Sequence, residues 1–220
     1  QLGRDFLTLV GYGIVSSVII GFLAGLIAIA LGTVIGAVSG FREGWIGESL
    51  NSISNIFLVI PAMALLIALS SALQVRSIFV VAVAIGLITW AWGARTIRSQ
   101  VLSLKTREFM DMAKISGLKD HALIFRELLP NMLSYILLVF MIQFGSAIVT
   151  EAGISMIGLG PTSGTSLGQL LYWSIEGHAL NYGAWWVFVV PGLLITLLAS
   201  ALLAMHAGME EYFNPRLRER

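Results

Sequence analysis

The sequence predicts an all-α membrane protein built from several spanning helices. Hydrophobic residues make up 57% of the 220 residues, charged residues only 11%, and the mean hydropathy is +0.89. Soluble domains contain about 25% charged residues. The apolar residues gather in long runs, and about 20 such residues cross a bilayer as a helix. We therefore expect residues 1–220 to form a single transmembrane domain.

Five runs reach or nearly reach the spanning length. They cover residues 14–39, 53–73, 78–94, 132–150 and 186–205. The third run is the shortest, and we expect uncharged polar residues at its ends to extend it. The chain begins with Gln1 and no signal peptide precedes the first run, so we expect a fragment of a longer protein.

The first run carries a stripe of small residues. Its members recur at spacings of three or four when Ala28 is included, and they are Gly21, Gly25, Gly32 and Gly36. Small residues on one face of a spanning helix let another helix approach closely. This pattern predicts tight helix packing along the first run.

The second run combines polar residues with a proline. Asn51 and Asn55 lie near its start and Pro61 lies within it. Proline removes a backbone donor and kinks a helix. Kinked helices with polar residues can line a translocation path, whereas polar residues at a helix end can also be interfacial. The sequence leaves both interpretations open for Asn51, Asn55 and Pro61.

The stretch 151–185 is largely uncharged and rich in glycine. Its glycines and Pro161 interrupt any regular spanning helix, so we expect an outer loop that partly folds back onto the helices. Glu151, Glu176 and His178 are then hydrogen-bonded or solvated loop residues.

The charged passage 108–131 predicts two short helices around a glycine. A helix over 109–116 can end at Gly117, which adopts the left-handed conformation at little cost. A second helix over 119–129 has an apolar face made of Leu118, Ala122, Phe125 and Leu129. Pro130 predicts a break before the next apolar run. The residues alone fit either an amphipathic loop on the membrane or a docking site for another protein.

Lysine and arginine set the orientation. If the charged passage is cytoplasmic, all of the 13 lysines and arginines except Arg4 and Arg76 lie inside. Cytoplasmic segments carry such an excess of basic residues. We therefore expect the first residues outside and the C-terminus in the cytoplasm.

The spacing within the charged passage resembles the cytoplasmic loop of bacterial ABC importer permeases. That loop has the pattern Glu-Ala-Ala, three residues, Gly, nine residues, then Ile-x-Leu-Pro. The corresponding positions of this sequence are Asp111, Met112, Ala113, Gly117, Leu129 and Pro130. Met112 departs from the first alanine of the family's pattern, and Glu127 stands where the family has isoleucine.

Four segments, in the right order, resemble the dipeptide, oligopeptide and nickel branch of these permeases. They are residues 2–5 (LGRD), 125–131 (FRELLPN), 151–160 (EAGISMIGLG) and 214–218 (NPRLR). Together they span nearly the whole chain.

This resemblance implies a type I importer permease with about five spanning helices here and six in the full-length protein. It implies the cytoplasmic membrane of a bacterium or archaeon, and peptides, nickel chelates or related small solutes as substrates. The implied partners are a second permease subunit, usually a different chain, two ATPase subunits that hold ATP and Mg²⁺, and an extracytoplasmic binding protein. The resemblance also implies that the charged passage 108–131 couples the permease to the ATPase. Asp111 would supply a charged contact or a charge at the helix N-terminus, Gly117 the turn, and Leu129 and Pro130 the return to the membrane.

Other functional classes leave little trace in the sequence. The chain has no Gly-Lys pair and hence no P-loop, so an ATPase must be a separate chain. It has no cysteine, which excludes disulfides and thiolate ligands. We expect no metal or cofactor on this chain, and its scattered basic residues do not predict nucleic-acid binding.

The two alternatives to a permease subunit are a serine hydrolase at the outer face and an autonomous channel or ion-coupled carrier. Residues 164–168 match Gly-x-Ser-x-Gly, with Ser166 as nucleophile and His178 as base, but no strand precedes them as a nucleophile elbow requires. An autonomous channel or ion-coupled carrier usually keeps charged groups within the membrane. The five runs contain none away from their ends, with His206 near the inner surface.

Overall fold

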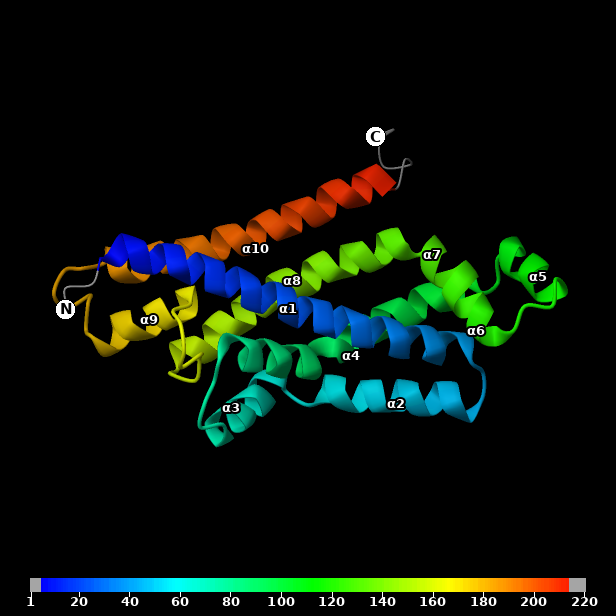
Figure 1. Cartoon of the computed structure of the whole chain (residues 1–220), viewed down its shortest axis with the longest axis horizontal. Helices are drawn as coiled ribbons and strands as arrows, with labels where there is room; N and C mark the ends of the chain where they lie inside the picture. The colour runs from blue at the N-terminus through cyan, green and yellow to red at the C-terminus, as the bar shows by residue number, and fades with distance from the viewer. Residues whose placement is uncertain (1–4, 214–220) are drawn as a thin grey trace.

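The computed structural model describes residues 5–213, and all regular structure among them is helical (Figure 1). Four helices are long and apolar enough to span a membrane, and a bent helix pair counts as a fifth if it is one span. The four are α1 (Phe6–Phe41), α4 (Ile78–Leu104), α8 (Leu133–Met156) and α10 (Trp186–Phe213). The predicted all-α class with about five spans is confirmed. The segments 2–4 and 214–218 that entered the family resemblance lie outside the described residues.

Helix α1 forms the centre of the bundle and packs chiefly against α4 and α8 (Figure 1). Asp5 caps its first turn, because its carboxylate accepts a hydrogen bond from the Leu7 N–H at 3.1 Å. With 36 residues, α1 is about 54 Å long at a rise of about 1.5 Å per residue. This exceeds a hydrocarbon core of about 30 Å, so α1 is strongly tilted or projects from the bilayer.

The second apolar run forms two helices that meet at a bend. Helix α2 (Trp45–Val59) and helix α3 (Ala62–Ala72) meet at an angle of 79°. Ile60, which precedes Pro61, has φ −71° and ψ 125°, the extended geometry that a following proline favours. The predicted kink at Pro61 is therefore present, and it is a full break in the helix.

Helix α4 is longer than predicted. The third run was expected to stop at residue 94, yet α4 continues through Arg95 and Arg98 to Leu104. The two arginines are long enough to reach polar surroundings from a helix end, so they need not terminate it.

The stretch after residue 150 is more regular than the sequence predicts. Helix α8 runs on to Met156, so Glu151 is a buried helix residue and the expectation of a loop residue there is wrong. Helix α9 (Leu167–Glu176) follows, with Ser166 at its N-cap, where the Ser166 hydroxyl accepts from the Gln169 N–H at 3.1 Å. Helix α9 packs against α1, α8 and α10, so much of the predicted outer loop is part of the bundle.

The charged passage folds into a compact helical cap. It contains α5 (Glu108–Ile115), α6 (Asp120–Ala122), the π-helical segment η1 (Leu123–Leu128) and α7 (Leu129–Asn131). Figure 1 shows this cap and the α1–α2 turn at one end of the molecule, whereas α9 and the α3–α4 connection lie toward the other. The charged cap and α9 therefore lie toward opposite ends of the molecule.

Candidate functional site

The first helix of the charged cap ends at Gly117 through a Schellman motif. The Gly117 N–H donates to the Lys114 carbonyl at 3.0 Å, and the Leu118 N–H donates to the Ala113 carbonyl at 3.4 Å. Gly117 has φ +78°, a conformation that side-chain-bearing residues rarely adopt. The turn at Gly117 therefore depends on the absence of a side chain.

The return from Gly117 to α8 is continuous but irregular. Within η1 the turn widens, and the Leu129 N–H donates to the Ile124 carbonyl, five residues earlier. The break predicted before the next apolar run is present at Met132, whereas Pro130 itself lies inside α7 and does not interrupt it. Leu129 keeps helical angles, φ −63° and ψ −43°, and the Asn131 amide donates to the Glu127 carbonyl at 2.6 Å.

The wide turn changes which side chains face the membrane bundle. Phe125 was predicted on the apolar inner face, but 60% of its surface is exposed. The buried residues of η1 are Leu123, Ile124 and Leu128. The prediction assumed a regular 3.6-residue period, which the π-helical segment interrupts.

A hydrophobic cluster fastens the cap to the bundle. It joins α5 and η1 to the ends of α1, α4 and α8, and its buried members include Ala37, Val101, Met110, Ala113, Leu128 and Met132. Met110 and Leu128 have no exposed surface. Burying such a side chain contributes roughly 1.5–3 kcal/mol, so α5 and η1 are held to the helix ends as one packed unit.

Two ion pairs connect the cap and its surroundings to the α1–α2 turn. Arg42 lies 3.4 Å from Asp120, and Lys105 lies 3.0 Å from Glu43. The hydrogen bond from Lys105, and its positive charge, lower the pKa of the Glu43 carboxyl below its ordinary value. Both pairs are at least partly exposed and contribute orientation more than stability.

The outer surface of the cap carries apolar side chains. Met112 is 67% exposed and Ile115 82% exposed, both on α5. Asp111 on the same helix is also exposed and pairs with Lys114 at 3.1 Å, while Ala113 points into the cluster. Exposed apolar residues beside charged ones are typical of a protein contact surface.

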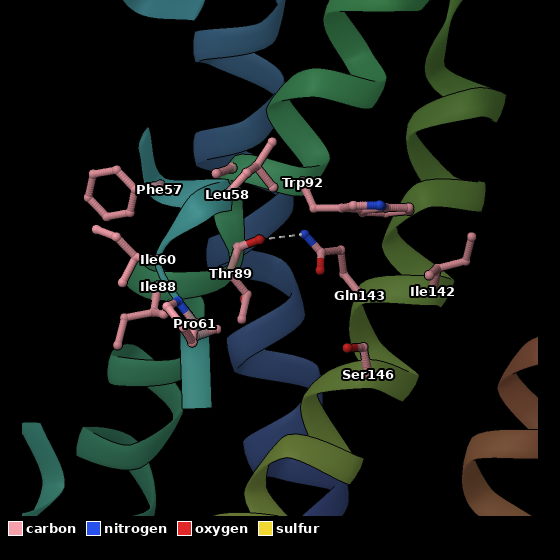
Figure 2. Close-up of a pocket in the computed structure, with 12 residues that line it drawn as sticks. Phe57, Leu58, Ile60, Pro61, Ile88, Thr89, Trp92, Ile142, Gln143 and Ser146 are labelled. Atoms are coloured by element: carbon pink, nitrogen blue, oxygen red, sulfur yellow. Dashed lines mark hydrogen bonds between the residues drawn. The ribbon is translucent and has the colours of Figure 1, made fainter. Parts of the chain in front are cut away.

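A cavity of about 370 Å³ opens at the break between α2 and α3 (Figure 2). Pro61, Trp92 and Gln143 are among its lining residues, and the Gln143 amide donates to the Thr89 carbonyl at 3.2 Å. Asn51 and Asn55 lie farther back on α2 and do not line this cavity. Of the three candidate path residues, the structure therefore places only Pro61 at the cavity.

Sequence reasoning missed Gln143. It is the one amide side chain within the apolar run 132–150, and it is 95% buried, with 5% of its surface exposed. A single strongly polar residue in a spanning segment costs free energy unless it has a partner or a role. The presence of one glutamine in an otherwise apolar run was therefore the signal in the sequence that could have identified Gln143.

The glycines of α1 face two different helices. Gly21 and Gly25 lie against Phe144 of α8, whereas Gly32 and Gly36 lie against Ala94 of α4. The stripe therefore serves two contacts, one in each half of α1.

The described residues offer little support for other chemistry. No group of three or more potential metal ligands occurs within 5–213. Ser166 is fully buried, caps α9 and donates a hydrogen bond to Glu151 at 2.6 Å, so its hydroxyl is engaged in structure. His178 lies beyond the other end of α9.

Comparison with known proteins places the chain in a family. Residues 32–219 match the family described as binding-protein-dependent transport system inner membrane component. The chain is 30% identical to the dipeptide transport system permease protein DppC of Alkalihalophilus pseudofirmus, over 99% of this chain and 71% of that protein. It is also 30% identical to the oligopeptide transport system permease protein OppC of Bacillus subtilis, over 100% of this chain and 71% of that one.

Solved structures share the fold. A chain of the MetNI methionine ABC transporter, in an inward-facing conformation, superposes with a TM-score of 0.72 at 18% identity, covering 94% of this chain and 99% of that one. A chain of an amino acid ABC transporter gives a TM-score of 0.61 at 16% identity, covering 96% and 100%. The chain thus belongs to the binding-protein-dependent transport system inner membrane components, the permease subunits of ABC importers.

Proposed function

We propose that this chain is a permease subunit of an ATP-driven importer that carries peptides or related small solutes across the cytoplasmic membrane. The dipeptide and oligopeptide permeases among its relatives support this substrate class. The same family resemblance leaves nickel chelates as a further possible cargo. ATP and Mg²⁺ would be bound by separate ATPase subunits, two of them for each pair of permeases.

The coupling role belongs to residues 108–131. The observation that carries it is the rigid attachment of α5 and η1 to the ends of α1, α4 and α8, with Met112 and Ile115 left exposed on the outer side. A partner that moves α5 must then move the spanning helices as well. ATP-driven closure of two ATPase subunits would in this way switch the permease between inward-facing and outward-facing states.

Individual residues of the coupling segment have distinct tasks in this mechanism. Asp111 lies in the first turn of α5 and supplies a negative charge at a helix N-terminus as well as a polar contact. Gly117 provides the turn, Ala113 and Leu129 pack toward the bundle, and Pro130 lies in the return to α8.

The distribution of basic residues supports a cytoplasmic position for this cap and for the C-terminus. The opposite end, with α9, would face a substrate-binding protein. A second permease subunit, in this branch usually a different chain, would form the other side of the translocation path. The cavity at Pro61 would open onto that path.

The test compares two glycines with the same backbone conformation. Gly117 and Gly183 have φ +78° and +74°, and a methyl group at either meets no atom within 4 Å. Gly183 lies in the α9–α10 connection, at the other end from α5 (Figure 1). Left-handed geometry costs a residue with a side chain about 1–2 kcal/mol. A change of 1.4 kcal/mol corresponds to about tenfold.

We expect Gly117→Val to lower the uptake per ATP hydrolysed by about tenfold in the reconstituted complex, since the cost of about 1–2 kcal/mol falls on the coupling turn. Gly183→Val should insert equally well and keep hydrolysis coupled to uptake. Equal coupling in the two variants would remove the coupling role from this segment. Uptake by the permease without nucleotide would favour an autonomous channel or carrier instead. A hydrolytic activity of the purified chain itself that disappears in Ser166→Ala would favour a serine hydrolase.

A further inference from the structure

A carboxyl group is buried among three elements at the end of the molecule opposite the coupling cap. Glu151 of α8 has no exposed surface. Within residues 5–213, none of the ion pairs includes it. A polar group in this position is costly unless hydrogen bonds satisfy it.

Three serine hydroxyls supply those hydrogen bonds. Ser155, one turn along α8, donates to Oε1 at 2.5 Å, and Ser166 donates to the same oxygen at 2.6 Å. Ser17 of α1 donates to Oε2 at 3.3 Å. All three serines are buried. The carboxyl group therefore joins α8 to α1 and to the N-cap of α9.

The direction of these hydrogen bonds follows from the backbone of α9. The Leu167 N–H donates to the Ser17 hydroxyl at 3.0 Å, and the Gln169 N–H donates to the Ser166 hydroxyl at 3.1 Å. Because each of these two hydroxyl oxygens already accepts a hydrogen bond from a backbone N–H, the hydroxyl's own hydrogen can point at Glu151. Two of the unpaired N–H groups at the start of α9 are thus linked to the carboxyl through one hydroxyl each.

The surrounding packing fixes the same junction. Gly168 of α9 lies so close to α8 that a methyl group there would be 2.6 Å from the Ala152 Cα atom. Leu167 has no exposed surface and belongs to the cluster that joins α1, α8, α9 and α10. Since an apolar substitute for Glu151 would leave three buried hydroxyls without their acceptor, this junction depends on the carboxyl oxygens.

We propose that Glu151 is a positioning residue that holds α9 against α8 and α1, so that the extracytoplasmic end is presented as one body to the binding protein. This inference rests on the proposed function. The exposed residues of α9, Trp173 and Glu176 among them, lie on the helix whose placement Glu151 sets. Loss of the junction then weakens productive binding-protein contact and leaves the distant coupling cap intact.

The first test measures the position of α9 directly. The chain has no cysteine, so spin labels can be placed on cysteines at Val149 of α8 and Ile175 of α9, which are 51% and 46% exposed. In the full-length subunit within its reconstituted complex, the unmodified junction should give one narrow distance distribution. Glu151→Leu should broaden it. Glu151→Gln keeps the oxygen that accepts from Ser155 and Ser166 and should retain the narrow distribution.

Two further variants keep this test decisive. Ser17→Ala removes the hydrogen bonds from α1 to Glu151 and to the Leu167 N–H and should broaden the distribution partly, so it serves if Glu151→Leu fails to insert. Ser174→Ala is the matched control, because Ser174 is a buried serine of α9 whose hydroxyl donates to the Leu171 carbonyl, not to Glu151. A narrow distribution in both Glu151→Leu and Ser17→Ala would overturn the proposal, whatever the complex transports.

The second test reads function. Glu151→Leu should raise the concentration of loaded binding protein that half-maximally stimulates ATP hydrolysis by at least about tenfold, since it leaves three buried donors without their acceptor and each costs free energy of that order. Basal hydrolysis should not change, and Glu151→Gln should restore the half-maximal concentration. An equal loss of basal and stimulated hydrolysis would contradict positioning. If no binding protein stimulates ATP hydrolysis even in the unmodified complex, the proposed function fails. The distances between the spin labels at residues 149 and 175 then still decide whether Glu151 positions α9.

Discussion

The ion pair between Glu43 and Lys105 is the simplest residue-scale feature to test. Glu43 is 86% exposed, yet the Lys105 ammonium lowers its carboxyl pKa from the ordinary value of 4.5. A carboxyl whose folded pKa is lowered contributes stability above its unfolded pKa and loses that contribution as the pH falls through the folded value. The pair should therefore persist at pH 4.5 and disappear only below it.

We expect Lys105→Met to return the titration of Glu43 to its ordinary range. Carboxyl carbon shifts of ¹³C-labelled glutamate in lipid nanodiscs would measure this, with Glu43→Gln to assign the signal. The charge of Lys114 also lowers the pKa of Glu43, but less than Lys105 does, so Lys114→Met should shift the Glu43 titration by less than Lys105→Met. A Glu43 midpoint that does not move in Lys105→Met would mean that the pair does not form in the membrane.

Single residues also show where sequence reasoning succeeds and fails. Gly117 was predicted as the turn because only glycine tolerates its backbone angles, and that is a local property. Phe125 was placed on the wrong face because the π-helical turn depends on packing against the bundle. Glu151 was taken for a loop residue because the glycines and Pro161 that follow it indicated a break in the helix, and its partner Ser17 lies 134 residues away in the sequence, so no local pattern indicated its burial.

At the scale of elements, the break between α2 and α3 has two possible causes. Pro61 disfavours a continuous helix by about 3 kcal/mol or more. The burial of Leu66 on α3, which has no exposed surface, stabilises the bent arrangement by roughly 1.5–3 kcal/mol. Because these contributions are similar, removing the proline should leave bent and straight forms both populated.

We expect Pro61→Ala to give two distances between spin labels at Ile46 and Leu69, with the new one about 7 Å longer, as a rise of about 1.5 Å per residue implies for the straight form. Uptake should fall because the cavity at the bend closes in that form. Pro191→Ala is the control, since Pro191 lies within α10 without breaking it. A single unchanged distance in Pro61→Ala would assign the bend to packing alone.

The elements themselves follow the sequence closely where hydropathy decides and poorly where polar residues intervene. The apolar runs located α1, α8 and α10, but their ends shifted, because α1 starts at Phe6 and α8 continues to Met156. Helix α9 was missed because Gly164 and Gly168 suggested a loop. Gly168 is instead the site of a close helix contact, which only the tertiary structure makes visible.

At the scale of the whole molecule, the buried hydrophobic side chains form separate clusters toward the two ends, joined by helix packing in the middle. One cluster packs the charged cap on the bundle, and another joins α9 to α1, α8 and α10. Between them, α1 packs on α4 and α8 over most of its length. If the charged cap is displaced, the helix ends on which it packs must move or separate from it. Family resemblance and basic-residue distribution predict that this end meets an ATPase, which stays a prediction, and neither shows how the cap packs on the bundle.

The most direct test of coupling is to ask what residue 115 touches. Ile115 is 82% exposed on the outer side of α5, and Val75, in the α3–α4 connection toward the other end, is 71% exposed. A single cysteine at either position is the only thiol within residues 1–220, because this sequence contains no cysteine. We expect the cysteine at 115 to cross-link to the ATPase subunit and to resist an impermeant maleimide added outside intact cells, while the cysteine at 75 reacts with it. Modification of residue 115 from outside, or an intact complex in which it cross-links to no ATPase, would contradict the account.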